Sequence, residues 1–158
     1  MALSEEALVA CYESVQHRLY NVLYRLLWQP QDCQDVMHEA FLQVWRRRDR
    51  VASESLEGLV FTTALNLARN QLRWKSLRTF VGLEQVPPGG DTPGHEDATL
   101  RQALDRLPAG HRQVLLLGEI GGFSTREIAG MLGIPEGTVG SRKHAAMKQL
   151  RQHLEHAP

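Results

Sequence analysis

The chain has 158 residues and no net charge at pH 7, with 42% hydrophobic and 23% charged residues. This composition is ordinary for a globular protein and allows one domain or two small ones. No run of eighteen apolar residues occurs, and the acidic start MALSEEALVACYE lacks the basic and apolar parts of a signal peptide. We therefore expect a cytoplasmic protein without membrane insertion, in which Cys11 and Cys33 are buried, reduced thiols.

Charge is segregated along the chain although its total is zero. Residues 5–44 hold two arginines against six acidic residues, and residues 45–78 hold eight cations against three acidic residues. Residues 79–100 hold four acidic residues and no Lys or Arg, whereas residues 101–158 hold eight cations against five acidic residues. Two basic blocks between acidic ones predict two contact sites for a polyanion, with other surfaces left for a different partner.

Helical periodicity predicts three N-terminal helices, near residues 4–28, 31–48 and 55–77, with Pro30 typical of a helix start. The second helix has an apolar half formed by Cys33, Val36, Met37, Ala40, Phe41, Val44 and Trp45. The third has one formed by Leu56, Val60, Phe61, Ala64, Leu65, Leu67, Ala68, Leu72 and Trp74. These faces predict a shared core.

Leu42 is an exception to the pattern of the second helix, because it lies within the polar half beside Asp35, His38 and Glu39. A single exposed leucine usually has no functional meaning. An apolar side chain ringed by polar and acidic ones could instead be the anchor of a partner site.

The polar arc of the third helix carries Thr62, Thr63, Asn66, Arg69, Asn70 and Arg73. This stripe has no carboxylate, whereas solvated helix faces normally mix both signs of charge. Cations, amides and hydroxyls together suit phosphates and base edges. The pattern favours contact with nucleic acid over an ordinary solvated face.

Residues 80–98, FVGLEQVPPGGDTPGHEDA, contain three prolines and four glycines together with acidic residues. Such a segment predicts a flexible linker. Strand signals are nearly absent on either side of it. We therefore expect an all-α fold of two small helical domains, residues 1–79 and 99–158, joined by this linker.

The C-terminal domain is predicted to contain helices near 97–107 and 110–121, followed by STREIAGMLGIPEGTV. Ser124 followed by Glu127 predicts a capping box at the start of a short helix, and Gly133 supplies the positive φ that ends it. Two further features of this stretch are steric. A small residue at 129 lets the next helix cross closely, and Val139 with Ile128 fills the wedge, as is typical of a helix-turn-helix. The alternative is a generic helical hairpin.

The last helix holds four cations and no acidic residue between positions 138 and 152. Its expected inward residues are Val139, Ala146, Met147, Leu150 and Leu154. Its expected outward residues are Ser141, His144, Ala145, Lys148, Arg151 and Gln152, with Arg142 on the flank. This distribution indicates a recognition helix that enters a major groove.

Three stretches carry a resemblance to a known family: QPQDCQDVMHEAFLQVWRRRDRV, LVFTTALNLARNQLR and LDRLPAGHRQVLLL…FSTREIAGMLGIPEGTVGSRKHAAMKQLR. In this order, with a linker between the second and the third, they resemble the extracytoplasmic-function group of bacterial RNA polymerase sigma factors, of the sigma-70 family. The first resembles the helix that docks on the polymerase clamp. The second resembles the helix that reads and melts the −10 promoter element, and the third resembles the domain that reads the −35 element.

The resemblance implies a chain that binds core RNA polymerase and promoter DNA, that is a monomer when free, and that is masked by a cognate anti-sigma factor. The implied polymerase contacts are Asp35, His38, Glu39 and Leu42. The implied −10 contacts are Arg46, Arg47, Arg50, Thr62, Asn66, Arg69, Asn70, Arg73 and Trp74. The implied −35 contacts are Thr138, Ser141, Arg142, His144, Lys148 and Arg151.

The last helix departs from this family in ways that weaken the expected −35 binding. Gly140, Ala145 and Met147 stand where the family commonly carries cations. Lys143 stands where the family prefers leucine, so its ammonium must reach outward along its own stem. Arg142 is the expected base contact, because its flank position would let the guanidinium fork onto a guanine.

Two other functions are compatible with parts of the sequence. A dimeric helix-turn-helix repressor would need an N-terminal ligand or partner domain and a dimer interface, and no heptad seam is present. An enzyme would need a catalytic motif, and the seven histidines form no H-E-x-x-H, P-loop or dinucleotide-binding turn. Cys33, His38 and Glu39 make a poor metal site. We expect no enzymatic activity, cofactor or metal.

Overall fold

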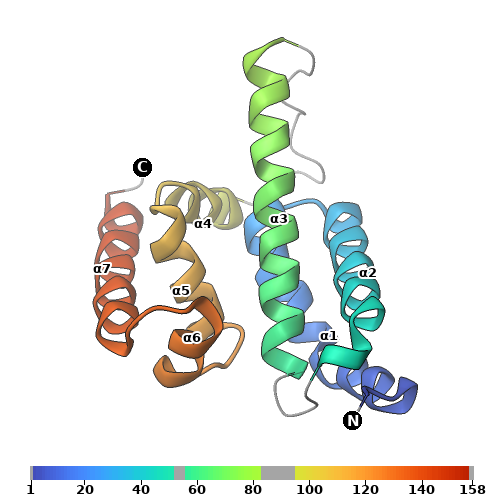
Figure 1. Ribbon diagram of the computed structural model, residues 1–158. Helices are drawn as coiled ribbons and strands as arrows, with labels where there is room; N and C mark the ends of the chain where they lie inside the picture. Colours follow the sequence, from blue (N-terminus) through green and yellow to red (C-terminus); the bar gives the residue numbers. More distant parts are fainter. Residues whose placement is uncertain (1, 52–55, 83–94, 157–158) are drawn as a thin grey trace. The chain divides into compact units, whose positions relative to one another are not determined.

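The computed structural model describes residues 2–51, 56–82 and 95–156. Seven α-helices occur in these ranges: α1 (Glu5–Leu27), α2 (Pro30–Arg46), α3 (Leu56–Phe80), α4 (His95–Asp105), α5 (Ala109–Glu119), α6 (Thr125–Leu132) and α7 (Glu136–Glu155), as Figure 1 shows. A short 3-10 helix, η1 (Arg48–Arg50), follows α2. No strand occurs in the described ranges. The expected all-α class is therefore confirmed.

The chain divides into two compact units, Met1–Pro88 and Gly89–Pro158. The expected linker, residues 80–98, falls mostly on residues 83–94, which lie outside the described part of the chain. At both of its ends, helix extends further than expected. Helix α3 continues to Phe80, and α4 already begins at His95.

Local signals in the sequence set the helix ends of the N-terminal unit. The Ser4 hydroxyl accepts a hydrogen bond from the Ala7 amide at 3.1 Å and begins α1. Helix α1 ends at Trp28, whose φ of 60° is the one positive value of a non-glycine residue in the described ranges. Pro30 then opens α2 at a position where a missing amide hydrogen costs nothing.

The core of this unit lies among α1, α2 and α3, and on α2 and the first half of α3 it largely follows the predicted faces. Helix α1 buries Val15, Leu19, Val22, Leu23, Leu26 and Leu27. Helix α2 buries Cys33, Val36, Met37, Ala40, Phe41 and Val44, and helix α3 buries Leu56, Val60, Phe61, Ala64, Leu65 and Ala68. Trp45, expected in the core, is only half-buried. Burial of these apolar side chains is the main favourable contribution to the stability of the unit.

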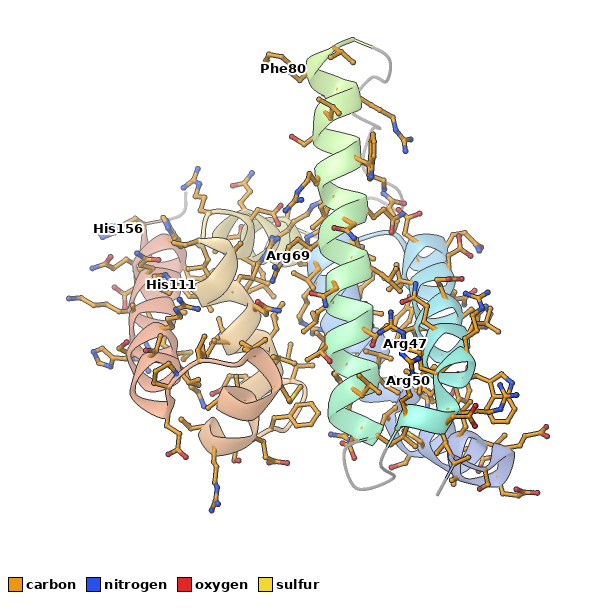
Figure 2. The ribbon with its side chains drawn as sticks, in the orientation of Figure 1. Arg47, Arg50, Arg69, Phe80, His111 and His156 are labelled. Atoms are coloured by element: carbon orange, nitrogen blue, oxygen red, sulfur yellow. The ribbon has the colours of Figure 1, made fainter. Side chains whose placement is uncertain are left out.

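The second half of α3 was wrongly expected to continue this core. Its buried residues end at Ala68, and the Trp74 side chain is 58% exposed. Figure 1 shows that α3 runs on beyond the ends of α1 and α2, so neither of these helices covers its last turns. Leu77 is exposed as well, and Phe80, labelled in Figure 2, is 88% exposed.

The C-terminal unit is centred on α5, which buries Val114, Leu115, Leu116 and Leu117. Helices α4, α6 and α7 each contact α5 or one another, and α7 makes its main contacts with α5. Phe123, in the turn before α6, adds a further buried ring. Leu154, expected to face inward, is 41% exposed because it lies in the last turn of α7. None of the helices in the described ranges is long and apolar enough to cross a membrane.

Candidate nucleic-acid and partner interfaces

Leu42 lies on the surface of α2, as predicted, with 48% of its side chain exposed. Polar contacts along the helix hold the acidic residues beside it. The Asp35 carboxylate accepts a hydrogen bond from Gln31 at 2.9 Å. The Glu39 carboxylate accepts one from Gln43 at 3.3 Å and pairs with Arg46 at 3.2 Å. Together with exposed His38, these side chains form a polar surface around a single apolar contact.

The basic residues at the end of α2 have different surroundings. Arg46 pairs with Glu39 and is thereby linked to the surface around Leu42. The Arg48 guanidinium lies 4.5 Å from the centre of the Trp45 ring and donates to the Trp45 carbonyl at 3.1 Å. Arg47 and Arg50, labelled in Figure 2, are exposed at the two ends of η1. Arg47 and Arg50 therefore have the more accessible positive charge.

Helix α3 brings Thr62, Asn66, Arg69 and Arg73 onto one arc, as their spacing predicted, and the last three are exposed. Asn70 is exposed beside them. The Thr62 hydroxyl donates to the Gly58 carbonyl at 3.0 Å, so toward an external group it can only accept. The arc therefore presents guanidinium donors and side-chain amides, which both donate and accept, with a half-buried hydroxyl acceptor at its end.

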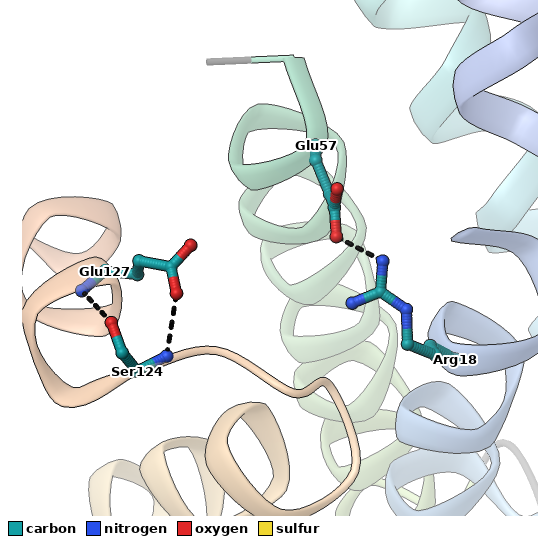
Figure 3. Close-up of polar contacts among 4 residues, drawn as sticks. All are labelled: Arg18, Glu57, Ser124 and Glu127. Carbon is teal, nitrogen blue, oxygen red and sulfur yellow. Dashed lines mark hydrogen bonds and ion pairs between the residues drawn. The ribbon is translucent and has the colours of Figure 1, made fainter. Parts of the chain in front are cut away.

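Two ion pairs that sequence reasoning missed join α3 to its neighbours. Glu57 in the first turn of α3 pairs with Arg18 of α1, as Figure 3 shows. Lys75 near the other end pairs with Asp32 of α2. The only described carboxylate of α3 is thus directed toward α1, and Lys75 is neutralised. Positive charge in the second half of the helix therefore lies mainly with the arginines.

The segment from the start of α6 to α7 has the predicted geometry. The Ser124 amide donates to the Glu127 carboxylate at 2.9 Å, and the Glu127 amide donates to the Ser124 hydroxyl at 3.1 Å (Figure 3). Gly133 ends α6 with φ of 67°. Ile128 and Val139 are 1% and 0% exposed, so they fill the wedge between the two helices. These features confirm the helix-turn-helix geometry over a generic hairpin.

The outer surface of α7 carries most of the predicted −35 contacts. Ser141, His144, Lys148 and Arg151 are exposed, while Thr138 is half-buried. Ala145, expected to face outward, is half-buried as well. A shallow hollow of about 490 Å³ runs along this surface; it is lined by Gly140, Lys143, His144, Met147, Lys148, Arg151 and Gln152. No carboxylate lines the hollow, so the surface is donor-rich and positively charged.

Arg142 and Lys143 extend from α7 back onto α5. The Arg142 guanidinium packs against Gly110, and its Nη1 lies 3.2 Å from the place where a Cβ would stand. The Lys143 ammonium reaches out along its stem, as expected, and lies 3.1 Å from the Glu119 carboxylate. The placement of Arg142 on α5 was not foreseen, because the sequence suggested a free flank position.

The first turns of α5 also hold an arginine that sequence reasoning overlooked. Arg112 donates to the Asp105 carboxylate at 2.9 Å, and this pair links α5 to the end of α4. Burial lowers the pKa of the Arg112 guanidinium, and the Asp105 carboxylate opposes that shift. The Arg112 Nε atom and the neighbouring His111 Nδ1 atom are buried without a hydrogen-bond partner. A buried donor without a partner costs stability, and the Asp105 contact, which is made through Nη1, does not satisfy the Nε atom.

Two family models match the chain, "Sigma-70 region 2" over residues 11–78 and "Sigma-70, region 4" over residues 97–150. The first match covers most of α1, all of α2 and nearly all of α3, and the second spans the helix-turn-helix. Together they cover more than half of the chain.

Curated relatives match across both units. The chain is 32% identical over 150 residues to the ECF RNA polymerase sigma factor SigE of Mycolicibacterium smegmatis, covering 87% of this chain and 57% of that protein. It is 32% identical over 164 residues to the ECF RNA polymerase sigma factor SigL of Mycobacterium tuberculosis, covering 98% of this chain and 93% of that protein. The chain therefore spans little more than half of one relative and nearly all of the other.

Two solved structures share the fold. The sigma factor RpoE in complex with the anti-sigma factor NepR, from Bartonella quintana, superposes with a TM-score of 0.73 at 21% identity, covering 93% of this chain and 96% of that one. CnrH in complex with the cytosolic domain of CnrY superposes with a TM-score of 0.78 at 22% identity, covering 98% and 92%. At these identities the likeness establishes the fold alone.

Proposed function

Because the chain belongs to the sigma-70 family of RNA polymerase sigma factors, in its extracytoplasmic-function group, we propose that it recruits core RNA polymerase to promoters and directs transcription initiation there. The N-terminal unit corresponds to region 2 and the C-terminal unit to region 4. The two units bind different partners. The first binds polymerase and the −10 element, and the second binds the −35 element.

The observation that carries this proposal is the exposed arc of α3, in which Asn66, Arg69 and Arg73 face outward with no carboxylate among them. Asn66 pairs with a base edge, and the arginines contact phosphates. Trp74 flanks the arc with 58% of its side chain exposed, and its ring offers a stacking surface for an unpaired base. Strand opening is then driven by tighter binding to separated strands than to the duplex.

The polymerase contact lies on α2, around Leu42. An exposed apolar side chain surrounded by Asp35, His38 and Glu39 resembles the centre of a small interface with a polar rim. This surface is separate from the arc of α3, so the N-terminal unit can bind polymerase and DNA together. Arg46 is an expected −10 contact, and it also pairs with Glu39 of the polymerase contact.

The chain acts by binding alone and catalyses no reaction. We place it in the cytoplasm, where RNA polymerase and promoters are found, as a monomer when free. An anti-sigma factor keeps it inactive by covering its units, as suggested by the two similar solved complexes. The alternative of a dimeric repressor is not favoured, because residues 11–78 match sigma-70 region 2 rather than a ligand-binding domain.

Run-off transcription with purified core polymerase on a library of promoter sequences tests the proposal. Core polymerase alone is the control for specificity, and Asn66→Ala is the matched variant. We expect promoter-specific transcripts only when the chain is added, and fewer of them with Asn66→Ala. If mass spectrometry shows no copurified inhibitor and no promoter-specific transcript forms, the proposal is wrong.

A further inference from the structure

Two neighbouring cations of α7 reach opposite ends of α5. Arg142 reaches Gly110 in the first turn of α5, and Lys143 reaches Gly118 and Glu119 in the last. The two glycines are eight residues apart, which corresponds to about 12 Å along a helix. Helix α7 therefore crosses α5 between them, and the absence of a side chain at each glycine leaves room for a cationic head group.

Three atoms of the Arg142 guanidinium lie close to Gly110. A Cβ added there would lie 3.2 Å from Nη1, 3.6 Å from Cζ and 3.9 Å from Nε of Arg142. The Nη1 end of the guanidinium is therefore the part nearest to the space that the glycine leaves open. The shortest of the three distances is tighter than most real Cβ contacts, so an added methyl group would shift the guanidinium by a few tenths of an ångström.

Arg142 differs from the nearby cations in its lack of a carboxylate partner among the described residues. Lys143 pairs with Glu119, and Arg112 pairs with Asp105. No carboxylate in the described ranges pairs with Arg142. Its guanidinium also lies at the N-terminal end of α5, where the helix dipole disfavours a cation. A half-buried cation in this position is left with its charge available to an anion.

We propose that Gly110 is a positioning residue that seats the Arg142 guanidinium on α5 and thereby directs it to a phosphate of the −35 DNA backbone rather than to a base edge. The inference rests on the proposed function of the C-terminal unit. A side chain laid back on α5 does not extend from α7 to the floor of the major groove. It remains at the side of the recognition helix, where the sugar-phosphate backbone comes into range.

The test measures binding of the full chain, in complex with core polymerase, to promoter DNA over a range of salt concentrations. Each protein is compared on two duplexes, one with the preferred −35 sequence and one with that sequence replaced. The variants are Gly110→Ala, Arg142→Ala and the combination of both. Gly130→Ala is the control, because a Cβ at that helical glycine meets nothing within 4 Å.

Loss of one phosphate contact makes the slope of log affinity against log salt shallower by about 0.9, which is a roughly fivefold to tenfold loss of affinity near 0.1 M salt. We expect the full change for Arg142→Ala and a smaller change in the same direction for Gly110→Ala, with the ratio between the two duplexes preserved. The double variant should lose no more than Arg142→Ala alone. Gly130→Ala should bind as the unmodified chain does.

Thermal stability separates positioning from folding. Alanine is a better helix former than glycine, so Gly110→Ala should keep or raise the melting temperature of the C-terminal unit while DNA affinity falls. If that variant does not fold, Arg142→Ala alone must still make the salt slope shallower.

Three results would overturn the inference. In the first, Gly110→Ala leaves affinity and salt slope unchanged. In the second, its effect persists in the Arg142→Ala background. In the third, Arg142→Ala abolishes the preference for the −35 sequence, which would make Arg142 a base contact. If instead the unmodified complex shows no dependence on the −35 sequence, the proposed function of this unit fails, and the result is distinct from all three.

Discussion

The Lys143 ammonium of α7 lies 3.1 Å from the Glu119 carboxylate, which belongs to the last residue of α5. At a helix C-terminus the dipole favours a cation, so the contact adds to the attraction between the two side chains. Both side chains are more than a third exposed, and water screens the pair. This contact lets a lysine occupy a position that faces the core.

We therefore expect weak coupling between Lys143 and Glu119. A double-mutant cycle with Lys143→Met and Glu119→Gln, measured by urea unfolding, should give a coupling energy of less than about 1 kcal/mol. Lys143→Met alone should be neutral or stabilising, because the methionine side chain packs on α5 and carries no charge that must stay hydrated. A loss of several kcal/mol for that single variant would show that the pair holds α7 in place.

Leu42→Ala should weaken binding to core polymerase by about 1–3 kcal/mol, because a central apolar contact is removed from a small interface. Helicity and melting temperature should hardly change, since the side chain is 48% exposed in the free protein. Val44→Ala, at a buried position of the same helix, is the matched control and should reduce stability instead. Unchanged polymerase affinity for Leu42→Ala would remove this residue from the interface.

Asn66→Ala and Arg73→Ala should affect promoter opening differently. The amide can read a base, so its loss should reduce opening and relax −10 sequence preference. The guanidinium can contact phosphate, so its loss should weaken binding to all −10 sequences alike. Permanganate footprints of open complexes on two −10 sequences measure both effects. Identical footprints with and without the Asn66 amide would contradict a reading role.

Salt dependence measures how many cations of α7 contact DNA. With Arg142, Lys148 and Arg151 as the main contacts, the isolated C-terminal unit should bind −35 DNA weakly, with a slope of log affinity against log salt of about −2 to −3. Lys148→Ala should make that slope shallower by about 0.9. Fluorescence anisotropy in a salt titration gives these values. Tight binding with a steep slope would show that Gly140, Ala145 and Met147, in place of the family's usual cations, do not weaken −35 binding.

The two cysteines should differ in reactivity. Burial, with a contribution from the Asp32 carboxylate, raises the pKa of the Cys33 thiol from 9.0 to about 12, so the folded chain keeps it protonated. Cys33 should then react with Ellman's reagent only on unfolding, whereas half-buried Cys11 should react sooner. A native protein in which both thiols react at one rapid rate would contradict this.

The raised pKa also predicts a change of stability with pH. Below pH 9 the Cys33 thiol is protonated in both the folded and the unfolded chain, and the contribution of its raised pKa to the free energy of unfolding is fully present. Between pH 9 and about 12 the unfolded chain releases the proton while the folded chain retains it, so stability falls as pH rises. Urea unfolding at pH 7.5 and 10 should show a smaller decline for Cys33→Ala than for the unmodified chain.

Features set by local chemistry could be predicted from the sequence. The capping box at Ser124 and Glu127 and the left-handed Gly133 depend on a few neighbouring residues, and the structure has both. The buried face of α2 follows from helical periodicity, which relates residues one turn apart. The exposure of Leu42 follows from the same periodicity.

Features that depend on how helices cross could not be predicted. Sequence spacing does not reveal that Lys75 meets Asp32 of α2 or that Arg142 rests on Gly110 of α5. Trp74 was assigned to the core because its spacing continues the apolar face of α3. Periodicity identifies a face but does not show where the neighbouring helices end. Helix α3 runs beyond the ends of α1 and α2, and Trp74 is exposed.

Helix α6 has eight residues, and its two ends are set independently, by the capping box at Ser124 and by Gly133. Between these ends, Ile128 and Ala129 are held against α7. Each residue of an α-helix turns the chain by about 100°, because a full turn takes 3.6 residues. One added or deleted residue within α6 would therefore rotate Ile128 and Ala129 away from α7 or move one of the caps. During evolution this segment should accept exchanges of one surface side chain for another, while changes in its length should be excluded.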